Sequence, residues 1–236
     1  IFSGERFLTF ILMGRILQRP IGTSTMSMQE NDESGTRFRF HPVQRDSVPN
    51  RYPDTDQLIY WCAVFDREGM APLEGGASAG NLSFRTASGF VITPTRGRMK
   101  GGLRWNNLVE VVRSNWSDYA VHFLGAGPPS SDSFLHEKIY VERPDVTAVF
   151  HGHDETVLRF GERLAGEMGL VFTPREIPFG TREDAEETAF ALGQNRYIIR
   201  KGHGFVSVGA SMDEAGEFAL QVHKRAVEMA KFPDSA

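Results

Sequence analysis

The sequence of 236 residues is poor in features that several classes of protein require. Its single cysteine, Cys62, excludes an internal disulfide and fits a reducing compartment, so we expect a cytoplasmic protein. An apolar run at residues 7–14 is too short to span a bilayer and lacks a convincing cleavage site, so we expect no signal peptide and no membrane partner. The chain also lacks an excess of positive charge: 26 Lys and Arg against 30 Asp and Glu give a formal net charge of −4 and a pI of about 6.0, which argues against binding to nucleic acid.

The remaining composition is that of a globular protein with a polar segment at its start. Hydrophobic residues make up 40% of the chain, which is enough to bury a sizeable core. Residues 20–50 are rich in Ser, Thr, Asn, Asp, Gln and Arg, a composition that favours a flexible segment. We therefore predict a flexible lead-in over residues 1–52 and one folded domain over residues 53–236.

From residue 53 onward, apolar periodicity and turn residues indicate helices and strands in irregular alternation. We predict helices over residues 54–69, 130–140, 154–168, 182–192 and 211–231. We predict strands over residues 80–85, 89–93, 146–153, 196–201 and 205–209, and a short helix leading into a strand over 105–112. Because several strands follow one another through short turns, we expect a mixed, largely antiparallel sheet with helices on both faces.

Three histidines are distinguished by their spacing and their glycine neighbours. His151 and His153 follow an apolar run, and side chains two residues apart on a strand share a face. A third imidazole from His203, which lies between Gly202 and Gly204, would complete the three-ligand set of a catalytic zinc. A fourth position would then be left for water or substrate. The simpler interpretation is that these are polar residues at the ends of strands.

Five short blocks of sequence occur in a characteristic order. They are GNLSFR at 80–85, ITPT at 92–95, PSSD at 129–132 with His136, RPDV at 143–146 with HGH at 151–153, and RKGHG at 200–204. In this order they resemble the class II aldolase/adducin family, whose best-known members are sugar-phosphate aldolases of the fuculose-phosphate type. The resemblance covers roughly residues 55 to 230.

The resemblance implies a three-layer α/β/α fold, usually assembled as a homotetramer with active sites at subunit interfaces. It also implies a metal, Zn²⁺ in most members and Mn²⁺ or another divalent ion in some, held by His151, His153 and His203. Asp132 stands where the family usually has a catalytic glutamate. The positions that match a substrate-phosphate site are Gly80, Asn81, Thr95, Ser130 and Ser131.

The chemistry of aldol cleavage is consistent with such a set of residues. Negative charge develops on an oxygen next to the carbon that loses its proton or its partner carbon, and a divalent ion stabilises the resulting enolate. A nearby carboxylate such as Asp132 can act as a base or an acid. We therefore expect a metal-dependent lyase of a small anionic substrate, most simply an aldolase of a sugar phosphate or related hydroxy-carbonyl compound. A decarboxylase, a dehydratase and a non-catalytic adducin-like binding module stay open as alternatives.

Several positions depart from the family pattern or have a simpler interpretation. Asp132 is one methylene shorter than the usual glutamate, and Asp is also a favoured helix N-cap. Arg96 follows Thr95 where the sugar-phosphate aldolases have a glycine. We expect His136, one turn beyond Asp132, to pack behind the site rather than line it. Lys100 is expected to be solvated.

Overall fold

The structure is a computed structural model that describes residues 39–43, 47–95 and 99–231. Within these residues, nine strands form one sheet in the order β1-β7-β6-β5-β4-β8-β11-β10-β9. Their bounds are β1 Arg39–Pro42, β4 Asn81–Arg85, β5 Phe90–Ile92, β6 Val109–Asn115, β7 Ala120–Leu124, β8 Ala148–Gly152, β9 Val171–Phe172, β10 Tyr197–Arg200 and β11 Gly204–Gly209. A separate two-stranded ribbon consists of β2 (Leu73–Glu74) and β3 (Ala77–Ser78).

The large sheet is mixed and mostly antiparallel, as predicted. The pairs β1–β7 and β9–β10 are parallel, whereas every other neighbouring pair is antiparallel. At the centre, β8 pairs with β4 on one side and with β11 on the other, so that His151 lies opposite Asn81 and Val206. The central position of β8 places the histidine motif among three strands that come from distant parts of the sequence.

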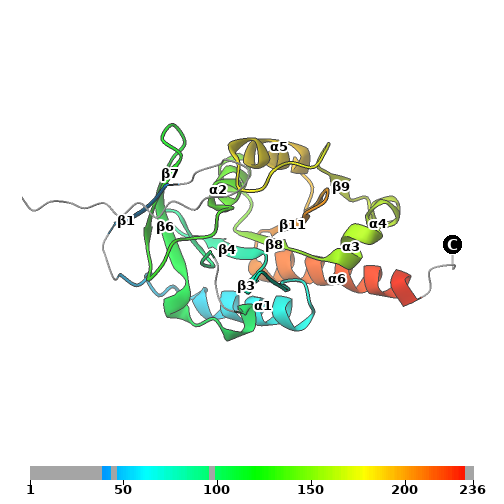
Figure 1. Ribbon diagram of the computed structural model, residues 1–236, viewed down its shortest axis with the longest axis horizontal. Helices are drawn as coiled ribbons and strands as arrows, with labels where there is room; N and C mark the ends of the chain where they lie inside the picture. The colour runs from blue at the N-terminus through cyan, green and yellow to red at the C-terminus, as the bar shows by residue number, and fades with distance from the viewer. Residues whose placement is uncertain (1–38, 44–46, 96–98, 232–236) are drawn as a thin grey trace, which may run out of the picture.

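Helices cover both faces of this sheet (Figure 1). Helices α1 (Thr55–Arg67) and α6 (Met212–Lys231) pack on one face, and α2 (Ser133–Glu142) and α5 (Arg182–Leu192) pack on the other. The neighbouring residues Val149 and Phe150 of β8 belong to opposite hydrophobic clusters, because successive side chains of a strand point to opposite faces. The sheet is therefore the middle of the three layers, and the expected α/β/α fold is confirmed.

One predicted helix is divided in two. Residues 154–168 form α3 (Glu155–Arg159) and α4 (Gly161–Met168), which meet at Phe160. At this break the chain passes directly over β9 and β10, and a Cβ on Gly161 would lie 3.2 Å from the ring of Phe172 and 3.3 Å from Ile199. None of the described helices combines the length and the hydrophobicity needed to cross a lipid bilayer.

Part of the predicted lead-in contributes to the fold. Strand β1 pairs with β7, and two residues just before α1 bind the buried carboxylate of Glu110, which is 1% exposed. Tyr52 Oη donates to Glu110 Oε1 at 2.5 Å, and the backbone and side-chain nitrogens of Asn50 donate to Oε2 at 3.1 and 2.9 Å. A buried carboxylate requires such donors. Residues of the predicted lead-in thus contact the sheet, while residues 1–38 and 44–46 lie outside the described part.

Replacing Tyr52 with phenylalanine is expected to lower the free energy of unfolding by about 1.5–3 kcal/mol, because a hydrogen bond to a buried charged group is lost. Tyr60→Phe is the matched control, since Tyr60 is 57% exposed on α1. Urea denaturation of both variants beside the wild type measures the difference. Equal stability of the two variants would contradict the role given to the Tyr52 hydroxyl.

Candidate metal centre and substrate cavity

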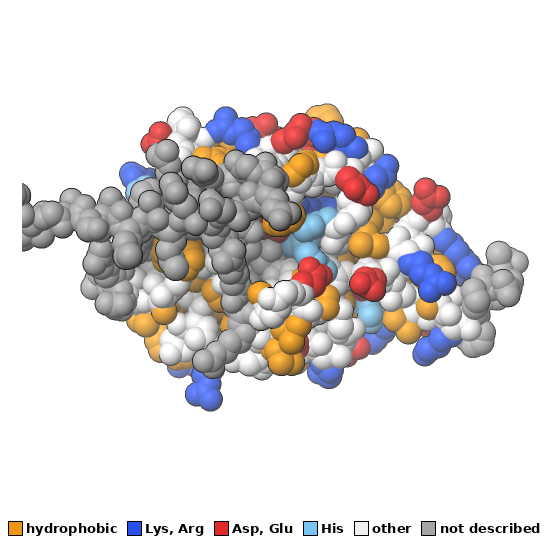
Figure 2. Space-filling view, viewed as in Figure 1, with side chains coloured by type: hydrophobic (Ala, Val, Ile, Leu, Met, Phe, Trp, Pro, Cys, Tyr) orange, Lys and Arg blue, Asp and Glu red, His pale blue; other side chains and the backbone are white. Residues whose placement is uncertain are grey.

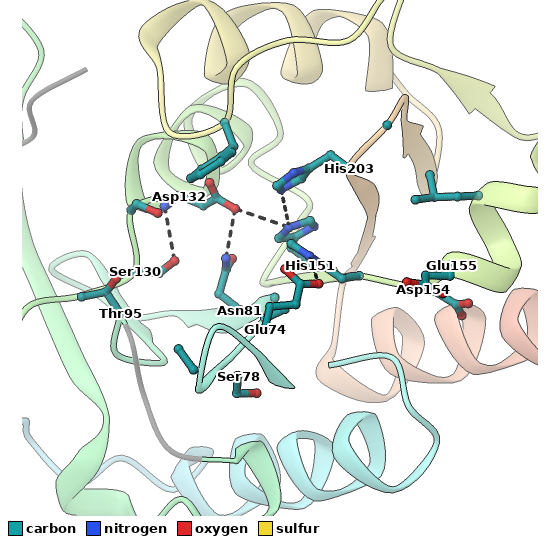
Figure 3. A pocket seen from close by; sticks show the side chains of 18 of the residues that line it. Glu74, Ser78, Asn81, Thr95, Ser130, Asp132, His151, Asp154, Glu155 and His203 are labelled. Carbon is teal, nitrogen blue, oxygen red and sulfur yellow. Dashed lines mark hydrogen bonds and ion pairs between the residues drawn. The ribbon is translucent and has the colours of Figure 1, made fainter. Parts of the chain in front are cut away.

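Three histidine side chains converge where β8 ends beside the β10–β11 hairpin. His151 is on β8, His153 follows that strand, and His203 lies in the turn between β10 and β11. One ring nitrogen from each histidine lies within 4.8 Å of the other two. Figure 3 shows the His151 and His203 rings facing one another beside Asp132. The structure therefore brings together the three residues that the sequence pattern singled out.

Glycines allow the backbones to approach closely around these histidines. A Cβ on Gly80, whose φ is +69°, would lie 2.5 Å from the carbonyl oxygen of His151. A Cβ on Gly204 would collide with the backbone of Gly152. Non-glycine residues cannot be accommodated at such distances without moving the backbone, so these glycines fix the spacing of β4, β8 and β11 at the histidine cluster.

Hydrogen bonds behind two of the rings determine which nitrogen faces the cluster. His151 Nδ1 lies 2.6 Å from the carbonyl oxygen of Phe205, and His153 Nδ1 lies 2.9 Å from Glu74 Oε1. Since a carbonyl or carboxylate oxygen accepts a hydrogen bond from Nδ1–H, each ring directs its Nε2 to the centre. The Nε2 atoms of His151 and His203 are 3.2 Å apart. This arrangement is typical of histidines that bind a metal ion.

Burial keeps two of these imidazoles neutral. Burial first, and then the charge of Arg200, lowers the pKa of His203 to about 3 and lowers the pKa of His151 well below its ordinary value. A neutral imidazole has the free electron pair that metal coordination requires. Three convergent imidazoles thus supply the donor set of a divalent metal site.

Asp132 lies beside the histidines, and Asn81 and Arg200 hold its carboxylate by hydrogen bonds. Its Oδ2 accepts hydrogen bonds from Asn81 Nδ2 at 3.0 Å and from Arg200 Nη1 at 3.4 Å, and lies 3.6 Å from His151 Nε2. Burial acts to raise the pKa of this carboxyl, but the charge of Arg200, together with the imidazoles and Asn81, holds the pKa far below its usual range. Asp132 is therefore ionised.

The second oxygen of Asp132 has the properties of a ligand-binding atom. Oδ1 is buried and has no hydrogen-bond partner among the described residues. Such an acceptor calls for a cation or a proton donor beside it, so the residues present fit a bound divalent ion or substrate. Asp132 does occupy the N-cap position of α2, yet its side chain makes no capping hydrogen bond. Capping therefore does not explain this residue.

Arg200 and Glu74 belong to the site but were not among the predicted site residues. Arg200 is 2% exposed, and its Nη2 donates to Asp184 Oδ2 at 2.5 Å. Its Nη1 lies 3.4 Å from Asp132 Oδ2 and 3.2 Å from His151 Nε2. Arg200 lies within the RKGHG block, which was the only sequence signal for it. Glu74 is placed behind His153 by the β2–β3 ribbon, and no motif around it indicated that contact.

The histidines and Asp132 line a cavity of about 500 Å³. The exposed ring of Phe179 stacks on His203 with 5.3 Å between the ring centres. Figure 2 shows histidine side chains in a hollow near the middle of one face, with acidic side chains beside them. The predicted phosphate-binding positions all line the same cavity, and they are Gly80, Asn81, Thr95, Ser130 and Ser131.

Lys100 differs from the sequence-based expectation. The side chain is 1% exposed rather than solvated, and its Nζ donates to the carbonyl oxygen of Ser78 at 3.3 Å. Burial lowers the pKa of this ammonium, and the carboxylate of Asp66 on α1 acts in the opposite direction. Lys100 therefore stabilises the β2–β3 ribbon beside α1, and it does not line the cavity. Arg96 lies outside the described residues.

Comparison with known families agrees with this geometry. The model for the class II aldolase and adducin N-terminal domain matches residues 56–229, and the chain belongs to this family. The fold also resembles the crystal structure of L-fuculose-1-phosphate aldolase from Thermus thermophilus, with a TM-score of 0.59 and 22% sequence identity over 77% of this chain and 96% of that one.

Relatives with three different reactions are similar in sequence. The 5-methylthioribulose-1-phosphate/5-deoxyribulose-1-phosphate aldolase of Rhodospirillum rubrum is 30% identical over 63% of this chain and 69% of its own length. The methylthioribulose-1-phosphate dehydratase of Gluconacetobacter diazotrophicus is 35% identical over 64% and 79%, respectively. The 3,4-dihydroxyphthalate decarboxylase of Arthrobacter keyseri is 25% identical over 68% and 71%. The family thus includes aldolase, dehydratase and decarboxylase activities.

Proposed function

We propose that this protein is a divalent-metal-dependent lyase that cleaves a small sugar phosphate, or a related hydroxy-carbonyl compound, by a retro-aldol reaction. The observation that carries the proposal is the convergence, in one cavity, of three imidazoles with Asp132 Oδ1, which no described residue hydrogen-bonds. Relatives named as aldolases of ketose 1-phosphates support the substrate class.

In this proposal His151, His153 and His203 hold the ion through one nitrogen each. Zn²⁺ is the first candidate and Mn²⁺ the second, since both accept imidazole ligands. When bound, the ion supplies a Lewis acid that stabilises negative charge developing on a substrate oxygen. The hydrogen bonds from His151 to Phe205 and from His153 to Glu74 hold these rings in the orientation that binding requires.

Asp132 would transfer the proton in this reaction. Retro-aldol cleavage breaks a carbon–carbon bond, converts a substrate hydroxyl into a carbonyl, and leaves the electron pair on the other fragment, which then takes up a proton. Oδ2 is occupied by Asn81 and Arg200, so Oδ1 is the oxygen available to accept or return that proton. The side chain of Asp132, which is one methylene shorter than the glutamate usual in the family, is thereby fixed in place by Asn81 and Arg200.

The opposite wall of the cavity would bind the phosphate. Ser130 and Ser131 lie just before the start of α2, where hydroxyls and backbone N–H groups suit an anion. Thr95 is adjacent, because its backbone N–H donates to the carbonyl oxygen of Pro128 at 3.2 Å. Gly80 and Asn81 line the cavity between this wall and the histidines, and a cavity of about 500 Å³ has the size of a small-molecule site.

Dehydration is the second candidate reaction. The dehydratase relative is 35% identical, and its named substrate, methylthioribulose 1-phosphate, is shared with the aldolase relative from Rhodospirillum rubrum. Dehydration removes a proton from the carbon next to the carbonyl and expels the hydroxyl of the following carbon, which takes up a proton and leaves as water. Both reactions need one group that accepts and returns a proton and a cation that stabilises an enolate, so the residues assigned above could serve either reaction. The two reactions differ in the proton that is removed, from carbon or from a hydroxyl, and in the bond that breaks, carbon–oxygen or carbon–carbon.

The decisive experiment is to incubate the zinc-loaded and manganese-loaded protein with L-fuculose 1-phosphate and with methylthioribulose 1-phosphate. Release of dihydroxyacetone phosphate and an aldehyde identifies aldol cleavage, whereas a product lighter by one water identifies dehydration. Asp132→Asn should retain the metal and lower kcat by about 10²–10⁴-fold. A protein that binds neither metal and converts neither compound would be better described as a binding module. We also propose that the protein assembles as a homotetramer, and light scattering would measure the mass of the assembly.

A further inference from the structure

A line of buried polar side chains runs from Asp132 away from the cavity, between β4 and α2. It alternates between the helix and the strand in the order Asp132, Asn81, His136, Ser83 and Tyr140. Asn81 Oδ1 lies 2.5 Å from His136 Nε2, His136 Nδ1 lies 2.6 Å from Ser83 Oγ, and Ser83 Oγ lies 2.7 Å from Tyr140 Oη. All five side chains are at most 5% exposed, so the line is shielded from bulk water along its length.

The line exists because a helical repeat matches a strand repeat. Positions 132, 136 and 140 are four residues apart, which is a rise of about 6 Å on a helix. Positions 81 and 83 are two residues apart on β4, which is about 6.6–6.8 Å on a strand. The two rows of side chains therefore interdigitate, and each polar group contacts one from the facing element.

The Asp132 oxygen at the end of the line determines the direction of every hydrogen bond in it, because Oδ2 accepts from Asn81 Nδ2 and from Arg200 Nη1. A carboxylate accepts only, so the amide nitrogen of Asn81 must face it and the amide oxygen must face His136. His136 Nε2 must then carry the proton, which leaves Nδ1 to accept from the hydroxyl of Ser83. Ser83 Oγ in turn accepts from the hydroxyl of Tyr140. Every donor points toward Asp132.

We propose that this line positions the Asp132 carboxylate, and that His136 is its central positioning residue, fixed as the neutral tautomer with the proton on Nε2. The inference rests on the proposed role of Asp132 in proton transfer. His136 does not line the cavity, so it acts only through Asn81. Without the His136 Nε2–H donor, the Asn81 amide is free to turn its oxygen toward Asp132. Two acceptor oxygens then face one another, and the hydrogen bond that holds the Asp132 carboxylate is lost.

Burial supports the neutral form of this histidine. His136 is 0% exposed, and burial lowers its pKa to about 3, with the negative charge of Asp132 acting in the opposite direction. The ring therefore keeps one donor and one acceptor nitrogen at neutral pH. Hydrogen bonds arranged in one direction polarise one another, which strengthens the last bond, from Asn81 to Asp132.

The tautomer can be read by nitrogen NMR without any substrate. We would label the histidines of the zinc-loaded and metal-free protein with ¹⁵N and record two-bond ¹H–¹⁵N correlations between about pH 5 and pH 8. His136, assigned by the signal lost in His136→Gln, should remain the Nε2–H tautomer throughout. Tyr140→Phe should shift the Nδ1 resonance and leave the tautomer unchanged. An Nδ1–H tautomer, an imidazolium at pH 7, or an Nδ1 resonance indifferent to Tyr140→Phe would overturn the proposal.

A matched pair of substitutions tests the positioning role. The amide of glutamine in His136→Gln can place an N–H where Nε2 lies, whereas the shorter side chain of His136→Asn cannot. With whichever sugar phosphate the wild type converts, His136→Asn should lower kcat by about 10- to 100-fold with little change in KM, and His136→Gln should recover most of the loss. Equal kcat values for the two variants would refute the positioning role. If the wild type converts neither compound, the proposed function has failed, and the NMR experiment still decides the direction of the line.

Discussion

His151→Ala should remove the bound metal, while His122→Ala should retain it. His151 supplies one of three convergent nitrogens, and two remaining imidazoles do not make a stable site for zinc in a protein. His122 lies on β7, away from the cavity, and is the matched control. Plasma mass spectrometry of protein purified without chelator and without a histidine tag should find about one ion per chain in the wild type and the control. Equal metal in His151→Ala would refute the three-histidine site.

A milder substitution at the same site distinguishes a residue that binds the metal from a residue that orients a metal-binding histidine. Glu74→Gln leaves all three histidines in place but replaces the carboxylate that holds His153 Nδ1. Loss of such an outer contact typically weakens metal binding by about 10- to 100-fold. Titration against a chromophoric chelator should therefore place Glu74→Gln between the wild type and His151→Ala. An affinity equal to that of the wild type would show that Glu74 does not orient His153.

Arg200→Met is expected to cost about 3–5 kcal/mol of unfolding free energy, because it leaves Asp132 and Asp184 as buried carboxylates without their cation. Arg175→Met is the control on the surface: Arg175 also contacts two carboxylates, but its side chain is 47% exposed, so its loss should cost less than about 1 kcal/mol. Denaturation in urea compares the two variants directly.

A second substitution shows whether charge is the cause. In Arg200→Met combined with Asp184→Asn, one of the two unpaired charges is removed, and part of the lost stability should return. If the double variant is less stable than Arg200→Met, packing of the guanidinium rather than its charge explains the loss. If Arg200→Met costs no more than Arg175→Met, the buried cation contributes no more than an exposed one, contrary to our expectation.

The sequence predicts the helices and the central strands, because the features that determine them are local, whereas β1, β7, β9 and the β2–β3 ribbon were not predicted. Turn residues and alternating apolar residues indicate β4, β5, β8, β10 and β11, and the spacing of His151 and His153 places both on one side of a strand end. That His203 lies close to His151 and His153 could be predicted from the glycines beside these histidines and from the order of the five sequence blocks.

The contacts behind these residues could not be predicted in the same way. Glu74 meets His153 across 79 positions of sequence, and Arg200 meets Asp132 across 68. No local pattern distinguishes an arginine that will be buried between two carboxylates from one that will be solvated. Lys100 shows the same limit, since the backbone carbonyl that binds it belongs to a ribbon of only four strand residues, Leu73–Glu74 and Ala77–Ser78.

The close backbone approaches at Gly80 and Gly204 have a consequence for how this family diversifies. The positions of His151 and its neighbours are set by main-chain contacts among three strands, and these contacts leave no room for a side chain. Part of the cavity lining, by contrast, comes from residues outside the strands, such as Thr95, Ser130 and Phe179. Mutation can therefore reshape substrate choice without disturbing the histidine frame. A histidine frame that the main chain fixes, with a lining that it does not fix, is consistent with relatives named for aldol cleavage, dehydration and decarboxylation.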